Sequence, residues 1–280
     1  NCGRPPVGPA PTPSRFRRPA AMNSSSLPAE VMGLGTRASK LARWQADWVA
    51  DRLRQFGHTV ELVEITTRGD AERISAIGDI GTGVFTKEIQ RALLAGDVDL
   101  AVHSLKDLPT EPVAGLVLAA VPARESVHDV LVVGVGSREP GVGKKESLLP
   151  VLAHGTRVGT GSVRRQAQLL HARPDLRVEG VRGNVDTRLA KLDAGKFDAL
   201  VLAEAGLKRL GLASRITQVL PPDVMLPAVG QGALGIECRA DDAKTQAALA
   251  ALDDAATHAA VRAERALLAQ LRGGGEWPNC

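Results

Sequence analysis

The sequence predicts an α/β protein with two similar lobes, a hinge between them and the start of a third piece at the C-terminal end. Two series of short apolar runs alternate with segments of helical periodicity, which is typical of parallel strands joined by crossover helices. A stretch rich in Gly, Ser and charge, residues 134–147, separates the two series and is predicted to be a surface loop. The length of 280 residues is enough for two domains.

The first series opens with a short apolar strand at residues 31–35. The helix that follows has Leu41, Trp44, Trp48 and Leu53 at helical spacing, and Gly57 ends it. The other predicted elements of this series are a strand at 59–65, a loop at 67–83, a helix at 85–95 and a strand at 100–103.

The second series repeats this alternation. Its predicted elements are strands at 157–159, 177–180 and 199–202 and helices at 162–172, 185–193 and 203–210. Residues 226–238 are small, apolar and rich in glycine, and we expect them to cross back to the first lobe. Two more helices are predicted at 243–252 and 257–271.

Four parts follow from these elements. Residues 1–30 are expected to be a disordered or extraneous N-terminal extension, because residues 1–21 hold six prolines, four arginines and no acid. Domain 1 is predicted to comprise residues 31–126 and 225–242, and domain 2 residues 127–224. Residues 243–280 are predicted to be a hinge helix and the truncated start of a small α+β domain 3.

Composition narrows the classes of partner. Aromatic residues make up 2% of the chain, which argues against base-stacking platforms for single-stranded nucleic acid. The net charge of +4 suits any acidic partner, but no recognition-helix or zinc-finger pattern favours nucleic acid. No apolar run approaches the length of a membrane span. We therefore expect neither a nucleic-acid partner nor a membrane.

Cysteine and histidine usage indicates no metal site and a reducing compartment. The three cysteines show no CxxC spacing, and the six histidines show no HExxH spacing. We expect a cytoplasmic location. A plastid is the weaker alternative, because the prolines at residues 1–21 would break the helix of a transit peptide.

Basic side chains gather in the loops that follow the predicted strands, where ligands bind in open α/β sheets. They are Arg37, Arg68, Lys106, Arg164, Arg165, Arg182 and Arg188. Arginine forks bind carboxylate or phosphate, and the small-residue turn at 159–162 predicts a helix start whose N–H groups also bind anions. The alternative is a solvated basic face, but it would place all these residues at strand ends by chance. We therefore favour a cleft for a polyanion.

One acid, Asp107, stands among these bases at the end of the strand at 100–103. A carboxylate there could stabilise a developing cation or move a proton, and nearby positive charge would keep it ionised. A surface pair with Lys106 or a helix cap is an equally simple explanation. The residues alone leave both interpretations open.

Eight ordered motifs resemble the porphobilinogen deaminase family, also called hydroxymethylbilane synthase, over about residues 31–275. They are TRASKLARWQA (36–46), TRGD (67–70), GVFTKE (83–88), AVHSLKDLP (101–109), GTGSVRRQ (159–166), RGNVDTRL (182–189), LAEAGLKRLGL (202–212) and LPAVGQGALGIECR (226–239). The resemblance implies two lobes like type II periplasmic binding proteins, with mixed, mainly parallel sheets.

The resemblance also implies an activity. Such an enzyme is a transferase that condenses four porphobilinogen molecules to hydroxymethylbilane and releases ammonia, in tetrapyrrole biosynthesis. A dipyrromethane cofactor primes the chain of polypyrrole intermediates and is attached to a cysteine. The family is typically monomeric. A two-lobe anion-binding protein without chemistry is the alternative, and Asp107 counts against it.

The resemblance implies roles for individual residues. Asp107 matches the catalytic aspartate, which would face pyrrole nitrogens and stabilise positive charge as ammonia leaves. The matches to carboxylate-binding arginines are Arg37, Arg164, Arg165, Arg182, Arg188 and Arg209. Other expected contributors to the site are Ser39, Thr160, Ser162, Lys106, Gln45 and Phe85, with Gln231 in the hinge-side crossing.

The chain departs from the family at the cofactor attachment. The family has a cysteine in a Leu-x-Gly-Gly-Cys-x-x-Pro context, and this chain has Gly275 at that position. Glycine carries no nucleophile, so we expect no covalent attachment there and an impaired activity. Thr82 stands where the family often has a lysine, which removes one cation from the predicted loop.

Overall fold

The computed structural model describes residues 31–65, 86–134 and 152–271. Several predictions made from the sequence lie outside these described residues. They concern the extension 1–30, Arg68, Thr82, Phe85, the surface loop from residue 135 onward and Gly275.

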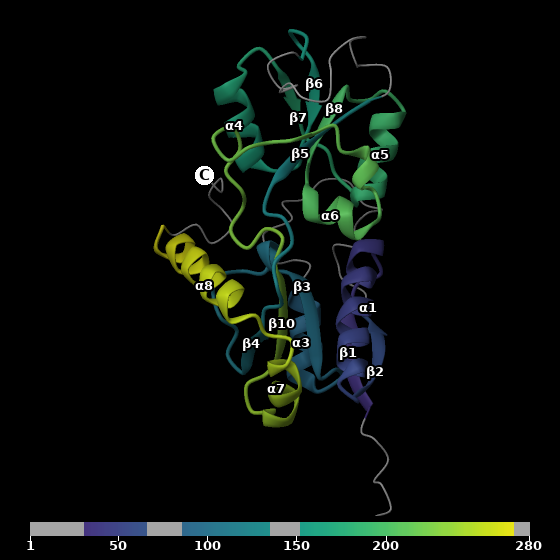
Figure 1. The fold of residues 1–280 in the computed structure, drawn as a ribbon, viewed down its shortest axis with the longest axis vertical. Coiled ribbons are helices and arrows are strands. Elements are labelled where there is room, and N and C mark those ends of the chain that lie inside the picture. The colour runs from purple at the N-terminus through teal and green to yellow at the C-terminus, as the bar shows by residue number, and fades with distance from the viewer. Residues whose placement is uncertain (1–30, 66–85, 135–151, 272–280) are drawn as a thin grey trace, which may run out of the picture. The chain divides into compact units, whose positions relative to one another are not determined.

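The first sheet has five strands in the order β2-β1-β3-β10-β4 (Figure 1). They are β1 (Val31–Thr36), β2 (Thr59–Glu64), β3 (Leu100–Ser104), β4 (Leu116–Ala120) and β10 (Leu234–Arg239). β1 pairs in parallel with β2 and β3, whereas β10 pairs antiparallel with β3 and β4. Helix α1 (Lys40–Gln55) follows β1, and helix α3 (Lys87–Ala95) precedes β3.

The second sheet repeats this arrangement in the order β7-β6-β8-β5-β9. Its strands are β5 (Asp129–Val133), β6 (Arg157–Gly159), β7 (Arg177–Glu179), β8 (Ala199–Ala203) and β9 (Gln218–Val219), with helices α4 (Val163–Ala172), α5 (Val185–Asp193) and α6 (Glu204–Arg209). β6 pairs in parallel with β7 and β8, and β5 pairs antiparallel with β8.

Each sheet therefore has three parallel strands followed by an antiparallel strand that arrives from the other sheet. This confirms the predicted pair of α/β lobes of the type II periplasmic-binding-protein kind. It also confirms the predicted return crossing, because β10 joins the first sheet. Strands β4, β5 and β9 are not among the predicted elements. No helix separates β4 from β5 along the chain, so the alternation of strand and helix gives no signal there.

Short polar side chains begin the helices. Ser39 accepts a hydrogen bond from the Ala42 N–H at the start of α1, and Ser162 accepts one from the Arg165 N–H at the start of α4. Asp242 and Asp254 cap α7 (Ala243–Ala250) and α8 (Ala255–Gln270) in the same way. These contacts satisfy N–H groups that a helix start leaves without partners.

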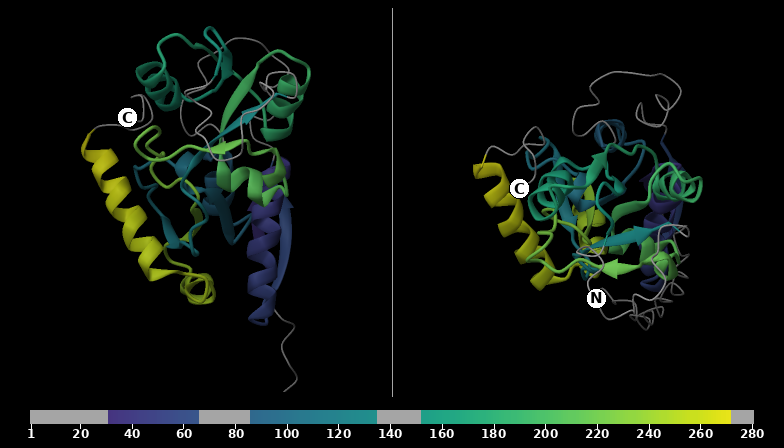
Figure 2. Two further views of the ribbon diagram at one scale, coloured as in Figure 1. Left: turned by 45° about the horizontal axis from the view of Figure 1, so that its top comes forward. Right: turned by 90° about the horizontal axis from the view of Figure 1, so that it is seen from above.

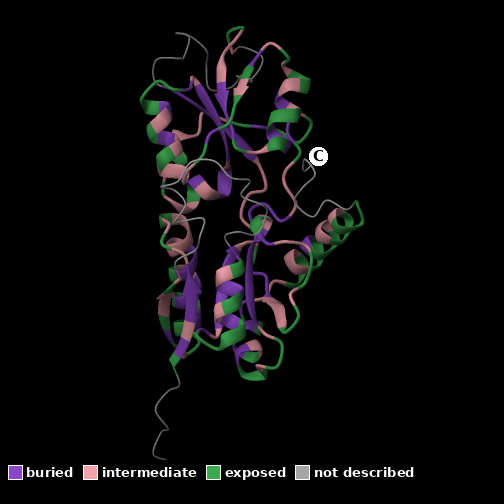
Figure 3. Ribbon diagram, turned by 180° about the vertical axis from the view of Figure 1, so that it is seen from behind, coloured by how far each residue is buried: buried purple, intermediate pink, exposed green. Residues whose placement is uncertain are grey.

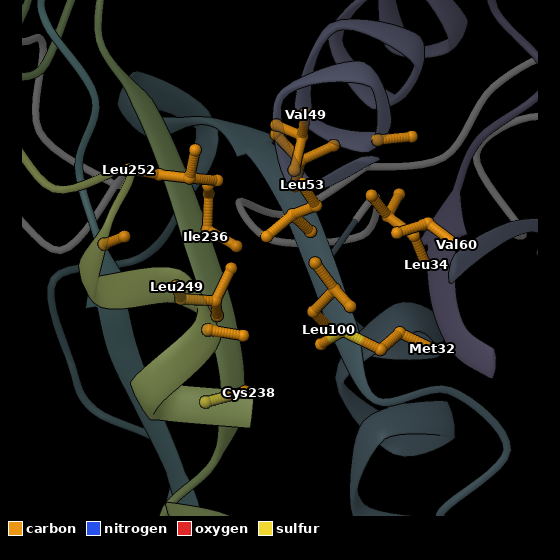
Figure 4. Packing of buried hydrophobic residues seen from close by; sticks show 14 of the residues in the cluster. Met32, Leu34, Val49, Leu53, Val60, Leu100, Ile236, Cys238, Leu249 and Leu252 are labelled. Carbon is orange, nitrogen blue, oxygen red and sulfur yellow. The ribbon is translucent and has the colours of Figure 1, made fainter. Parts of the chain in front are cut away.

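The core of the first sheet joins residues that are far apart in the sequence (Figure 4). Leu34, Leu53 and Leu100 are fully buried together with Ile236 on β10. Helix α7 closes the same cluster with Leu249, and Leu252 adds to it just after the helix ends. Buried residues follow the strands of both sheets (Figure 3). Helix α7 thus stabilises the first sheet, while the division of the chain into domains stays a prediction.

Two crossing segments connect the sheets and touch each other. The first comprises residues 121–128, between β4 and β5, and the second comprises residues 220–233, between β9 and β10. The Arg124 side chain donates from Nε to the Gln231 carbonyl at 2.8 Å, and the Glu125 N–H donates to the Gly232 carbonyl at 3.2 Å. Gly232 has a φ of +84°, and a methyl group there would overlap the carbonyl oxygens of Glu125 and Ser126. The crossing therefore requires glycine at this position.

Gly232→Ala is expected to destabilise the folded chain by about 3 kcal/mol or more, because both the left-handed backbone and the close approach oppose a side chain. Gly57→Ala is the matched control, since φ is +87° there but no heavy atom lies within 4 Å of the added Cβ. Gly57→Ala should lower the free energy of unfolding by about 1–2 kcal/mol. Urea unfolding measures both values. Equal losses would show that the crossing tolerates a side chain at Gly232.

Candidate functional site

The candidate site begins where β3 ends. Residues Leu105–Asp107 form one turn of 3-10 helix, in which Leu105 is buried, Lys106 is half-buried and Asp107 is exposed. The Leu105 N–H donates to the Ala233 carbonyl at 3.0 Å. Gly230 lies so close that a Cβ there would be 3.3 Å from the Lys106 nitrogen. The turn that presents Asp107 therefore rests on the second crossing segment.

A second acid, Asp129, lies at the start of β5 and is fully buried. Its carboxylate accepts hydrogen bonds from Arg164 Nη2 at 2.7 Å, from Arg165 Nη2 at 2.7 Å and Nε at 3.0 Å, and from Gln231 Nε2 at 3.0 Å. Burial would raise the pKa of Asp129, but the charges of Arg165 and Arg164 outweigh it and hold this pKa below its usual value. Asp129 is therefore an ionised carboxylate shared by two arginines.

Arg164 and Arg165 are almost completely buried, at 2% and 5% exposure. Arg165 also donates from Nη1 to the Val201 carbonyl at 3.1 Å, and Arg164 donates from Nη1 to the Leu226 carbonyl. The pair therefore fastens α4 to β5, β8 and the second crossing segment. A ligand carboxylate at either guanidinium would compete with these partners.

Lys106 and Arg188 lie within electrostatic reach of Asp107. Burial, followed by the charge of Arg165, lowers the pKa of Lys106 to about 8. Burial also lowers the pKa of Arg188, while Asp107 acts in the opposite direction. Arg188 donates from Nε to the Gly183 carbonyl at 2.8 Å. Both cations are held in surroundings that disfavour positive charge, so an added anion would stabilise them.

The start of α1 brings further predicted residues to the same region. Gln45 is buried and donates from Nε2 to Ser104 Oγ at 2.7 Å, next to the turn that carries Asp107. Arg37, at the end of β1, is half-buried. Arg209 on α6 donates to the Gly232 carbonyl at 2.7 Å, and its guanidinium lies 5.8 Å from the centre of the Trp44 ring.

Three predicted hydroxyl donors have local partners. Ser39 and Ser162 are helix caps, and the buried Thr160 accepts at Oγ1 from the Ser162 N–H at 3.2 Å. These hydroxyls shape the helix starts. Arg182 is exposed, and within the described residues no hydrogen bond or ion pair joins its guanidinium to Asp107 or Asp129.

Sequence reasoning missed Asp129, although a signal for it exists. It is the acid that opens DVLVV, a run whose five residues are all buried. A carboxylate in such a strand requires a partner, and the adjacent arginines 35 and 36 residues later supply it. The spacing alone does not identify the pair, because the second sheet must form first.

Other kinds of site find no support in the described part of the chain. No group of three or more His, Cys, Asp or Glu side chains is arranged there to hold a metal ion. Within the same residues, no helix is both long enough and apolar enough to cross a membrane.

Known proteins are similar to this chain in sequence. A family model described as porphobilinogen deaminase, dipyromethane cofactor binding domain, matches residues 32–247. Curated relatives named porphobilinogen deaminase include that of Syntrophotalea carbinolica, 49% identical over 253 residues, which are 89% of this chain and 77% of the relative. The relative from Desulforudis audaxviator is 53% identical over 248 residues, 88% of this chain and 77% of its own.

One solved structure, of the methionine-binding protein MetQ, is similar with a TM-score of 0.48 and 14% sequence identity, over 84% of this chain and 95% of that one.

Asp129→Asn is expected to destabilise the chain by about 3–5 kcal/mol at neutral pH, because two buried arginines lose their counter-ion. The folded pKa of Asp129 lies below the usual value of 3.8, so the stability due to its charge is present above that pH. This stability is lost as the pH falls through the folded pKa. The difference in free energy of unfolding between Asp129→Asn and the unaltered chain should therefore narrow in acid.

The surface pair Arg215–Asp193 gives the control, since Asp193→Asn should cost about 1 kcal/mol or less. Urea unfolding at several pH values provides the measurement. If Asp129→Asn proved as mild as the control, Asp129 would not be the counter-ion of the arginine pair.

Proposed function

Because this chain belongs to the porphobilinogen deaminase family, we propose that its two lobes bind porphobilinogen and catalyse its condensation to hydroxymethylbilane, with Asp107 at the reacting centre. The family match confirms the resemblance seen in the sequence. It assigns the chain to a family of transferases whose matched domain binds a dipyrromethane cofactor. The observation that carries the proposal is an exposed carboxylate, Asp107, beside cations that burial has destabilised.

The substrate supports this assignment of charges. Each porphobilinogen ring carries an acetate and a propionate, so a growing polypyrrole is a polyanion. Lys106 and Arg188 have no carboxylate in ion-pair contact within the described part of the chain. A substrate carboxylate would stabilise both groups through charge-assisted hydrogen bonds. We propose these two residues as direct carboxylate ligands, with Arg37 as a third from the first lobe.

Asp107 has a different role in this proposal. Loss of ammonia from the aminomethyl group leaves positive charge on the pyrrole ring. An ionised carboxylate close to the ring nitrogen stabilises that charge in the transition state. Asp107 is exposed, so it can face a bound ring, whereas the buried Asp129 is occupied by Arg164 and Arg165. In this proposal Asp107 therefore acts in the reaction, whereas Asp129 stabilises the fold.

The same cations suit the carboxylates of the dipyrromethane cofactor, which primes the condensation when it is bound. Covalent attachment is a separate matter. Gly275 stands at the matching position and offers no sulfur for a thioether. We propose that this chain does not hold the cofactor covalently at that position and that its turnover is impaired. A monomeric state, carried over from the resemblance, and a cytoplasmic location, expected from the cysteine usage, are part of the same proposal.

An anion-binding protein without chemistry is the second candidate, and Gly275 is the observation that favours it. The two functions differ in one property. A binding protein leaves porphobilinogen intact at every protein concentration, whereas a deaminase consumes it once a primer is attached.

Gly275→Cys is expected to restore attachment of the primer, seen as added mass in mass spectrometry, and to raise porphobilinogen consumption in an Ehrlich-type colour assay. Adding Asp107→Asn to this variant should leave the added mass unchanged. The porphobilinogen affinity should stay within about threefold of that of Gly275→Cys, because the basic ligands remain. Consumption should fall about 100-fold or more, because the charge on the ring loses its partner.

Two outcomes would contradict the proposal. The first is an unaltered consumption rate in the double variant, which would remove Asp107 from the reaction. The second is a Gly275→Cys variant that carries the added mass and binds porphobilinogen but consumes none, which would favour the binding protein.

A further inference from the structure

Helix α8 reaches the segment that follows Asp107 with the side chain of Arg265. This guanidinium donates from Nη1 to the Leu108 carbonyl at 2.9 Å and from Nη2 to the Pro109 carbonyl at 2.6 Å. Leu108 and Pro109 come directly after Asp107 in the chain. We propose that Arg265 is a positioning residue, which fixes the direction of the Asp107 carboxylate by anchoring the chain on its C-terminal side.

The turn that carries Asp107 has an independent anchor on its other side. There β3 is paired with β10, and the Leu105 N–H donates to the Ala233 carbonyl. After Asp107, the Leu108 N–H donates to the Leu105 carbonyl at 3.2 Å, a bond within the turn that does not connect it to the rest of the fold. The Arg265 guanidinium makes that connection. Without it, the contact that the described residues still provide at this end of the turn would be packing of the Leu108 side chain.

That packing involves α8 as well. Leu105, Leu108 and Val121 form a buried cluster with Ala233, and Val261 from α8 completes it. Val261 is the fully buried residue of this helix, and it lies one helical turn before Arg265. The apolar contact and the two hydrogen bonds therefore come from the same face of α8.

The chemistry of Arg265 suits a structural anchor. Its surroundings lower its pKa through burial, and the attraction of Glu237 opposes this. Hydrogen bonds from a charged donor to carbonyl oxygens are stronger than neutral ones. The planar fork reaches two successive carbonyls at once, which an ammonium group cannot do with the same geometry.

Helix α8 is itself held firmly, so it can act as a support. At its start, the Asp254 N–H donates to the Val121 carbonyl at 2.9 Å, and the Asp253 carboxylate accepts from the Val121 N–H at 2.7 Å. Near Arg265, the Glu264 carboxylate accepts from Arg124 Nη2 at 3.0 Å and from the Gly230 N–H at 2.7 Å. Helix α8, yellow in Figure 2, therefore links the crossing segments to the Asp107 turn.

Arg265→Gln tests the proposal by amide hydrogen exchange of the otherwise unaltered 280-residue chain. The Leu108 amide should exchange about tenfold faster, as expected for the loss of hydrogen bonds from a charged donor, whereas the Leu105 amide should keep its rate because the Ala233 carbonyl still holds it. Arg262→Gln is the matched control, because Arg262 lies on the same helix and is exposed. It should leave these amides unchanged, and the β5 amides should be unchanged in both variants.

An unaltered exchange rate at Leu108 would overturn the proposal. An increase of equal size at β5 would also overturn it, because it would show a general loss of stability instead of a local one.

A kinetic comparison, which rests on the proposed function, adds a second test. In the Gly275→Cys background, Arg265→Gln should lower kcat about tenfold and change KM by less than about twofold, with partial recovery in Arg265→Lys. A kcat equal to that of the parent would overturn the positioning role. If the parent itself consumed no porphobilinogen, the proposed function would fail, and hydrogen exchange alone would decide the role of Arg265.

Discussion

The buried carboxylate of Asp129 is the interaction on which the rest of the site depends. It compensates two almost fully buried guanidinium groups, and any one of the three charges alone would be costly to bury. Through Arg164, Arg165 and Gln231, it joins helix α4, strands β5 and β8 and the second crossing segment. Arg164 and Arg165 already have these partners, whereas Lys106 and Arg188 are cations of the described residues that lie within electrostatic reach of Asp107.

The crossing segments transmit this constraint from the second sheet to the first. Gln231 contacts Asp129 on one side, and its neighbour Gly230 lies against the turn that presents Asp107. The glycines at 230 and 232 allow the close approach. Helix α8 supports the same turn from the other side through Arg265. The position of Asp107 therefore depends on contacts from the second crossing segment and from helix α8, both distant from it in the sequence.

The sequence predicted the parts of the fold that rest on local pattern. Helix periodicity located α1 and α4, and the small-residue run at 226–238 correctly predicted the return to the first sheet. Arg188 was chosen because it follows a predicted strand, and the structure brings it within electrostatic reach of Asp107. Local pattern does not predict Asp129 or Arg265, since each acts on residues brought near only by folding. Ser39 and Ser162 were predicted as ligand donors, and the structure shows each also capping a helix.

We propose that Lys106 is held ready for a substrate carboxylate, and calorimetry of porphobilinogen binding at pH 8 tests this role. The pKa of Lys106 is about 8 in the chain without ligand, and a bound carboxylate would raise it. Binding should then take up about half a proton, measured in buffers of different ionisation enthalpy, and affinity should fall as the pH rises above 8. Lys106→Met should abolish the uptake. Tight binding without proton uptake, or the same uptake in Lys106→Met, would show that Lys106 does not pair with a substrate carboxylate.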